Sequence, residues 1–293
     1  MSEVKVFGDG LGRVGVREIV PNLYWLSHCL GEHAPNWMEV YRGVPVEMRR
    51  RRIDIQFSSF LFVDSKSAII DTLGPMQRAH LMEAVEYVLD GRPLDYVWVS
   101  HTELPHAGNA NALRERYPGS KIVAANGGDH YEVHGLDGAM LVDPGDKIKL
   151  GQHTLEMVDP LFVDHGLTQW VYERKTGFLC TVDWALNFHV TPRECFKFLD
   201  ELDESLPFLP DDLLINMRTQ FPWLAWTNPV ETNGAVDRLF ARGVKILAPM
   251  HGALVRKDMA GYVKLLKEAM TQAATLPFVL DLKPASKAIK ARA

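Results

Sequence analysis

Cysteine is scarce in this chain of 293 residues. There are three, Cys29, Cys180 and Cys195, and they are widely separated and form no CxxC pair. An odd number of distant cysteines argues against a disulfide framework and against a zinc site built from thiolates. We therefore predict that all three are reduced thiols, and that Cys180 packs inside a buried apolar run at 178–182.

Long apolar runs and an excess of basic charge are also missing. No stretch approaches the roughly 20 apolar residues that span a bilayer, and the N-terminus lacks the basic-then-apolar pattern of a secretory signal. Lys and Arg number 32 against 37 Asp and Glu, a net charge of −5, which gives no global basic surface for nucleic acid. The basic cluster 49–52 is explained by a solvated loop, with an anionic partner as the alternative. We expect a soluble, cytoplasmic protein that binds neither membrane nor nucleic acid.

The composition supports a large core, since 47% of the residues are apolar. At this length we expect a single domain over residues 1–293. Segment 28–54 follows neither the helical nor the strand period, so we predict an inserted loop or lid there. The Lys- and Ala-rich segment 283–293 is predicted to be a frayed tail.

Apolar periodicity predicts strands and helices that alternate along the chain. Two β-rich runs, 55–64 and 68–73, predict a hairpin, and 78–89 places its apolar residues on one helical face. Further strands are predicted at 96–100, 121–125, 146–158 (a hairpin across Gly151), 169–173, 178–182 and 244–248. Further helices are predicted at 107–117, 192–202, 230–241 and 258–272. This interleaving predicts a mixed α/β layer protein.

A group of metal-binding side chains follows the predicted strand 96–100. His101, Glu103 and His106 lie within six residues at its C-terminal end, where open α/β sheets place their ligands. Imidazole combined with carboxylate suits iron or manganese as well as zinc. An HxExxH pattern alone is weak evidence, because a surface loop with two chance histidines gives the same letters.

Three more candidate ligands, His165, Asp183 and His251, stand beside other predicted strands. Any one of them alone would be read as an ordinary hydrogen-bonded side chain. Six candidates from four separate strand ends make coincidence a poor explanation, and they predict a site for two metal ions. The position of His165 is open by one residue, because Asp164 is next to it.

Three phrases, HTELPHAG, TVDWA and APMHGALVRKD, resemble the metallo-β-lactamase superfamily and, within it, the flavodiiron oxygen and nitric-oxide reductases. The resemblance runs from about Val16 to Leu265 and implies a four-layer αββα sandwich. It implies that one metal is held by three residues, the other by two, and that one carboxylate bridges them. The implied ligands are His101, Glu103 and His165 for the first metal, His106 and His251 for the second, and Asp183 as the bridge.

Glu103 is the informative position in this resemblance, since hydrolytic zinc members of the superfamily usually carry His there. The resemblance thus implies two iron ions, with two zinc ions as the alternative. Pro105 replaces the Asp of the family motif and cannot bind metal, so the second metal should be more open or more weakly held. The chain ends at Ala293, so we expect no flavodoxin domain, no flavin bound by this chain, and an external electron donor.

The function implied is that of a non-haem diiron oxidoreductase that binds, activates or reduces O2 or NO. Three alternatives stay open: a dinuclear zinc metallohydrolase, a diiron oxygenase acting on a small organic substrate, and a gas sensor without turnover. The substrate and the electron donor are left open, and a homodimer is compatible with the sequence.

Other polar residues near the six ligands are candidates for orienting the imidazoles. They are Thr102, Asn109, Trp184 and Asn187. The remaining histidines are predicted to be structural or to lie on the surface, with His33 and His189 as the first exceptions to consider.

Overall fold

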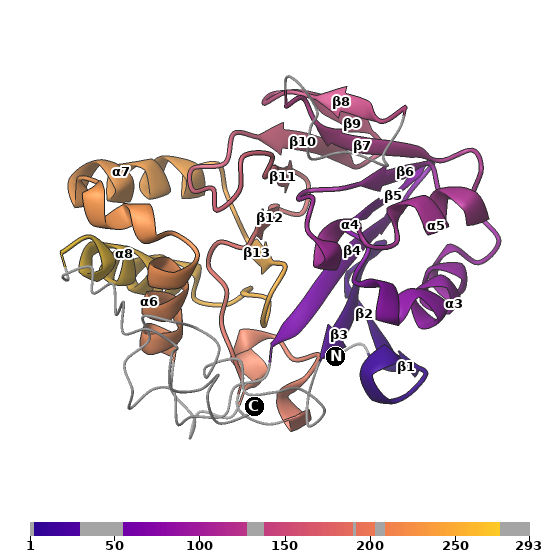
Figure 1. Ribbon diagram of the computed structural model, residues 1–293, viewed down its shortest axis with the longest axis horizontal. Helices are drawn as coiled ribbons and strands as arrows, with labels where there is room; N and C mark the ends of the chain where they lie inside the picture. The colour runs from indigo at the N-terminus through magenta and orange to yellow at the C-terminus, as the bar shows by residue number, and fades with distance from the viewer. Residues whose placement is uncertain (1–2, 30–54, 128–137, 190–191, 203–208, 276–293) are drawn as a thin grey trace, which may run out of the picture.

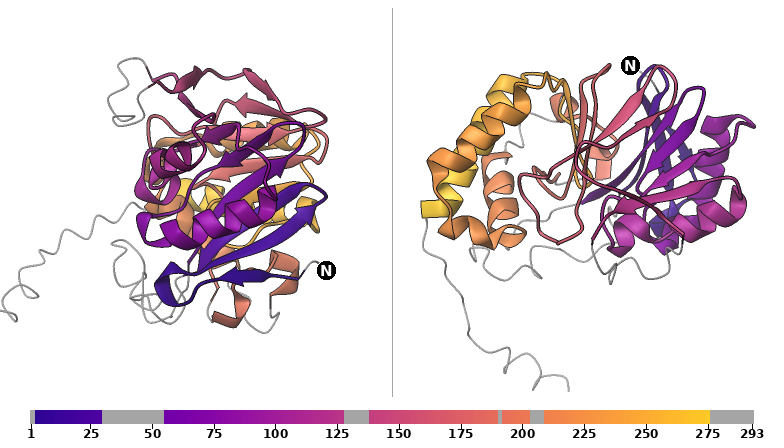
Figure 2. Two further views of the ribbon diagram at one scale, coloured as in Figure 1. Left: turned by 90° about the vertical axis from the view of Figure 1, so that its right-hand side faces the viewer. Right: turned by 90° about the horizontal axis from the view of Figure 1, so that it is seen from above.

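The computed structural model describes residues 3–29, 55–127, 138–189, 192–202 and 209–275. Two β-sheets face each other in the middle of the molecule, and helices cover the outer face of each sheet (Figures 1 and 2). The layers therefore follow the order helix, sheet, sheet, helix. This arrangement confirms the predicted αββα sandwich.

The first sheet has eight strands that lie side by side in chain order. They are β1 (Lys5–Phe7), β2 (Val14–Val20), β3 (Leu23–Cys29), β4 (Gln56–Val63), β5 (Ser67–Ile70), β6 (Tyr96–Trp98), β7 (Lys121–Ala125) and β8 (Met140–Val142). Neighbours from β1 to β5 are antiparallel, and those from β5 to β8 are parallel. The parallel half brings the carboxyl ends of β5 and β6 to the same edge of the sheet.

The second sheet has five strands in the order β13, β12, β11, β10, β9. They are β9 (Lys147–Lys149), β10 (Thr154–Val158), β11 (Trp170–Glu173), β12 (Phe178–Val182) and β13 (Ile246–Pro249). β12 and β13 run parallel although about sixty residues separate them in the chain. Their carboxyl ends therefore meet, so Asp183 and His251 start from neighbouring positions.

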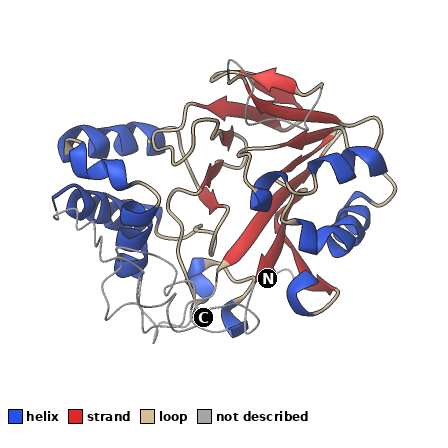
Figure 3. Ribbon diagram, viewed as in Figure 1, coloured by secondary structure: helices blue, strands red, loops and turns tan. Residues whose placement is uncertain are grey.

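Helices form the two outer layers (Figure 3). α3 (Arg78–Leu89), α4 (Leu104–Ala107) and α5 (Ala110–Arg116) lie on the side of the first sheet, and α6 (Leu209–Thr219), α7 (Pro229–Phe240) and α8 (Met259–Thr275) on the side of the second. Short 3-10 turns are η1 (Gly10–Gly12), η3 (Pro75–Gln77), η5 (Pro192–Glu194), η6 (Leu199–Glu201) and η7 (Pro222–Trp226). No helix in the described part of the chain is long and apolar enough to cross a membrane.

Aromatic side chains fill the space between the two sheets. Phe60 and Phe62 of β4 both meet Phe178 of β12, with ring centroids 5.0 and 5.4 Å apart and nearly perpendicular rings. All three side chains are fully buried. Burial of this apolar area and the edge-to-face geometry both stabilise the contact between the sheets.

The predicted helix 192–202 is wrong. Two 3-10 turns, η5 and η6, occupy this segment, and Phe196 between them has a φ of 64°. Its backbone N–H donates to Gln56 Oε1 at 2.6 Å and not to a carbonyl one helical turn earlier. A left-handed residue held by a distant side chain interrupts the helical ladder.

The prediction of three reduced cysteines is also wrong. Cys29 and Cys195 form a disulfide across 166 residues of sequence, whereas Cys180 is free and buried, as predicted. The bond ties the end of β3 to the segment after η5. The predicted lid 28–54 begins inside β3, and its other residues, 30–54, lie outside the described part of the chain, as do His33 and the predicted tail 283–293.

Candidate metal centre

Two groups of side chains with metal-binding atoms share Asp183. One group contains His101, Asp164 and Asp183, and the other contains His106, Asp183 and His251. Within each group the ligand atoms all lie within 4.8 Å of one another. The fold has therefore brought residues from four separate segments to one place.

Asp183 owes its position to an irregular end of β12. The pairing register of β12 with β13 shifts between Cys180 and Val182, and Val182 has a φ of 53°. A β-branched residue in the left-handed region is strained, which is typical of functional sites. The N–H of Trp184 donates to the carbonyl of Thr181, so a tight turn presents the Asp183 side chain inward.

His106 is oriented by Asp71, a residue that is not among the predicted site residues. Asp71 follows β5, and its Oδ2 accepts hydrogen bonds from His106 Nδ1 and Ser100 Oγ, both at 2.6 Å. Its Oδ1 accepts the Ser100 N–H at 2.7 Å. The only signal in the sequence was a carboxylate at the end of a buried apolar run. A carboxylate that holds Nδ1–H leaves the other ring nitrogen for a metal.

Two of the ring nitrogens that face the shared carboxylate lack hydrogen bonds. His101 Nε2 lies 3.7 Å from Asp164 Oδ1 and 3.7 Å from Asp183 Oδ2, and His106 Nε2 lies 3.6 Å from Asp183 Oδ1. Both nitrogens are buried without a hydrogen-bond partner. Buried polar atoms without partners cost free energy, and imidazole and carboxylate atoms at this spacing fit around a cation.

His251 approaches Asp183 more closely, with Nε2 2.8 Å from Oδ1. Burial by itself would lower the pKa of His106, but the carboxylates of Asp183 and Asp71 raise it to about 9. Burial would raise the pKa of Asp183, but the charges of His106 and His251 hold it well below the usual range. The centre is thus a strongly coupled set of opposite charges.

The remaining predicted ligands, Glu103 and His165, lie beside these groups. The His165 ring is 4.8 Å from the ring of His101, and the neighbouring Asp164 contributes the carboxylate of the first group. Glu103 is exposed, and its backbone N–H donates to His101 Nδ1 at 3.1 Å. The carboxylate of Glu103 belongs to neither group among the described residues.

A cavity of about 140 Å³ opens next to His251. Its lining among the described residues is Ile55, Phe57, Glu103, Pro105, Leu186, Gln220 and His251. Most of these side chains are apolar, and the Phe57 ring meets the His251 ring edge-on at 4.8 Å. A cavity of this volume has room only for a small molecule.

Two of the four candidate orienting residues hold segments that carry predicted ligands. Asn187 exchanges hydrogen bonds with the backbone of Ala253, and a Cβ at Gly252 would lie 2.1 Å from the Asn187 carbonyl oxygen. Asn109 donates to the carbonyls of Thr72 and Gly74, both at 2.8 Å. Of the other two, Trp184 packs against Phe162 and Trp170 and Thr102 is partly exposed.

Residues 52–179 match the family model of the metallo-beta-lactamase superfamily. This part of the chain is therefore similar to that superfamily, and the two sheets with histidine and carboxylate groups at their edge have the αββα fold. Its structural neighbours include flavodiiron proteins. The chain is 26% identical to putative diflavin flavoprotein A 1 of Nostoc sp., over 77% of this chain and 40% of that protein.

Two further proteins are similar to this chain over most of its length. A nitric oxide reductase of Moorella thermoacetica is 23% identical over 82% of this chain and 57% of its own length. The structure of rubredoxin oxygen:oxidoreductase from Desulfovibrio gigas superposes with a TM-score of 0.67 at 18% identity, over 88% of this chain and 60% of that one. The chain spans about half the length of these proteins. At this identity the structural likeness shows the fold.

Proposed function

We propose that the chain holds two iron ions that share Asp183, and that this centre binds and reduces O2 or NO. The observation that carries the proposal is the pair of histidine and carboxylate groups with one common carboxylate. A mixture of imidazole and carboxylate without thiolate suits iron. The relatives named nitric oxide reductase and rubredoxin oxygen:oxidoreductase support the same class of reaction.

The ligands follow from the two groups. We assign His101 and Asp164 to the first metal, His106 and His251 to the second, and Asp183 to both. Glu103 and His165 stand next to the first group, and we propose them as its further ligands. When bound, a pair of metal ions would supply electrons and a common binding place for a diatomic molecule.

Other residues of this chain would orient the metal ligands and enclose the reactant. Asp71 would hold the Nδ1 proton of His106, and the apolar side chains of the cavity beside His251 would keep water from a small reactant. We propose that electrons come from an external donor, that no flavin is bound by this chain, and that it works in the cytoplasm.

Metal analysis of the chain purified without chelators, combined with absorption spectroscopy, tests the proposal. We expect about two irons per chain and a near-ultraviolet ligand-to-iron charge-transfer band. With a chemical reductant, the protein should consume O2 or NO continuously. Uptake that stops at one molecule per site would indicate a sensor, and two zincs without iron would move the assignment to a metallohydrolase.

A further inference from the structure

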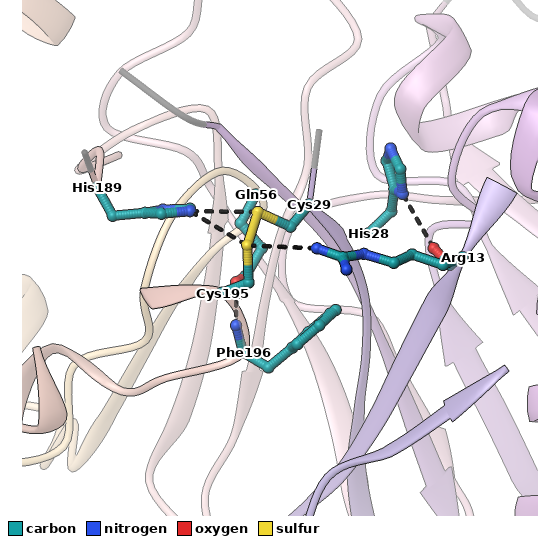
Figure 4. The surroundings of a disulfide bond; sticks show 7 residues. All are labelled: Arg13, His28, Cys29, Gln56, His189, Cys195 and Phe196. Carbon is teal, nitrogen blue, oxygen red and sulfur yellow. Dashed lines mark hydrogen bonds between the residues drawn. A yellow bond between two sulfur atoms is a disulfide. The ribbon is translucent and has the colours of Figure 1, made fainter. Parts of the chain in front are cut away.

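The disulfide lies in a separate cluster that shares no residue with the candidate metal centre. His189 Nε2 lies 3.2 Å from the sulfur of Cys29 and 3.4 Å from that of Cys195 (Figure 4). All three residues are buried, with exposed fractions of 1%, 9% and 6% for Cys29, Cys195 and His189. One imidazole nitrogen is thus directed at both sulfurs in a site with little contact with solvent.

We propose that Cys29, Cys195 and His189 form a second metal site, which reduction of the disulfide opens to a thiophilic divalent cation such as zinc. Two thiolates and one imidazole are a donor set typical of zinc. In a tetrahedral zinc site the ligand atoms are roughly 3.5–3.8 Å apart, as bond lengths of about 2.0–2.3 Å require. The imidazole nitrogen already lies close to that distance from both sulfurs.

A cationic side chain lies beside the disulfide. The Arg13 guanidinium, on the side of the disulfide opposite His189 in Figure 4, has Nη2 3.8 Å from the sulfur of Cys195. A neighbouring cation stabilises a thiolate.

The chemistry balances with a dithiol as reductant. One thiolate of the reductant attacks a sulfur of the bond, and its second thiol then resolves the mixed disulfide. Two electrons and two protons end on Cys29 and Cys195, and the reductant becomes a disulfide. Binding of zinc releases the two protons. A reversible bond of this kind fits the predicted cytoplasmic location, where lasting structural disulfides are rare.

Cobalt titration of the full chain tests the proposal, because a bond from sulfur to cobalt gives an intense near-ultraviolet charge-transfer band. The ligands proposed for the iron centre contain no sulfur, so its success or failure does not affect this readout. We expect the band in reduced protein and not in oxidised protein. Absence of the band after verified reduction would overturn the proposal.

Variants locate the site. Cys29→Ser/Cys195→Ser should abolish the band, and the matched control Cys180→Ser, a buried thiol in β12, should leave it unchanged. His189→Gln should retain a band but weaken cobalt binding, because one of the three protein ligands is lost. An unchanged affinity in His189→Gln would remove the histidine from the site.

A measurement on the unaltered chain covers the case in which these variants do not fold. Reduced protein is alkylated with and without zinc, and the modified peptides are identified by mass spectrometry. Zinc should protect Cys29 and Cys195 together, with Cys180 as the internal reference. Equal alkylation of both cysteines with and without zinc would refute the site.

Discussion

Asp71 and Val182 both adopt the left-handed backbone conformation, with φ of 60° and 53°. For residues other than glycine this conformation costs on the order of 1–3 kcal/mol and persists only where the surrounding structure requires it. Each residue stands at the end of a strand, where it places a carboxylate near the candidate centre. The strain thus coincides with the positions that the proposed metals would need.

Asp71→Asn should weaken binding of the second metal by about 10–100-fold. The Ser100 N–H donates to Oδ1, so the amide of the variant would turn its NH2 group toward His106 Nδ1. That contact would shift the ring proton to Nε2, the nitrogen that faces Asp183. Chelator competition measures the affinity. Asp95→Asn, which changes a carboxylate bound to the Ser67 N–H, is the control, and an equal loss there would refute the argument.

Glu103→His should shift metal preference from iron toward zinc if the Glu103 carboxylate is a ligand, because imidazole replaces a hard oxygen donor. Metal content after growth in medium containing both metals gives the answer. Asp164→Asn is the comparison, since Asp164 lies 3.7 Å from His101 Nε2 and Glu103 is exposed. Unchanged iron loading in Glu103→His, with loss in Asp164→Asn, would keep Asp164 as a ligand of the first metal and remove Glu103.

Local sequence indicated that His101, Asp183 and His251 follow strand ends, and the structure brings their side chains together. Their role as metal ligands stays a prediction. Local sequence was not sufficient for Asp71, because a single carboxylate after an apolar run is common. The pairing of Cys29 with Cys195 could not be predicted from local sequence either, since only the packing of distant segments brings the two sulfurs together.

At the level of elements, apolar periodicity predicted the helices and strands that bury one face against the core. α3 spans Arg78–Leu89 as predicted, and the hairpins β4–β5 and β9–β10 are in place. The first three strands were not predicted. In β2, for example, polar and apolar residues mix without regular alternation. Residues 192–202 do not form the helix that their local sequence favours, because Phe196 bonds to Gln56 and Cys195 bonds to Cys29. Contacts between such distant residues cannot be predicted from a local pattern.

The disulfide should stabilise this arrangement of elements by about 2–5 kcal/mol, since it closes a long loop in the unfolded chain. Reduction of the chelator-treated protein is expected to lower the free energy of unfolding in urea by that amount. Cys29→Ser/Cys195→Ser should match the reduced protein and should not respond to reductant. A common unfolding midpoint for the oxidised and reduced chains would show that the bond adds no stability.

Across the whole molecule, a charge network connects the first sheet to segments that follow the strands of the second. Arg17 of β2 donates to both oxygens of Glu201 in η6, at 2.6 and 2.8 Å, and to the carbonyl of Phe196 at 3.0 Å. Arg256, after β13, donates to Glu201 Oε1 at 2.7 Å. Because Arg17 is only 5% exposed, loss of its partner would leave a buried charge uncompensated.

Glu201→Gln should therefore destabilise the chain by about 1–3 kcal/mol at pH 7, in line with hydrogen bonds between charged groups. The hydrogen bond from Arg17 is the main cause that lowers the pKa of Glu201 below its ordinary value of 4.5. A lowered pKa gives stability that is fully present above about 4.5 and is lost as the pH falls through the folded-state value. The difference between wild type and variant should consequently shrink below pH 4.5.

Urea unfolding of both proteins between pH 7 and pH 3 measures this difference. Glu86→Gln is the control, because Glu86 pairs with Arg116 at the surface, where both side chains are more than half exposed. An exposed pair contributes about 0–1 kcal/mol, so the control should unfold with the wild type at every pH. A difference for Glu201→Gln that stays constant down to pH 3 would mean that packing, and not the charge on Glu201, joins η6 to the first sheet.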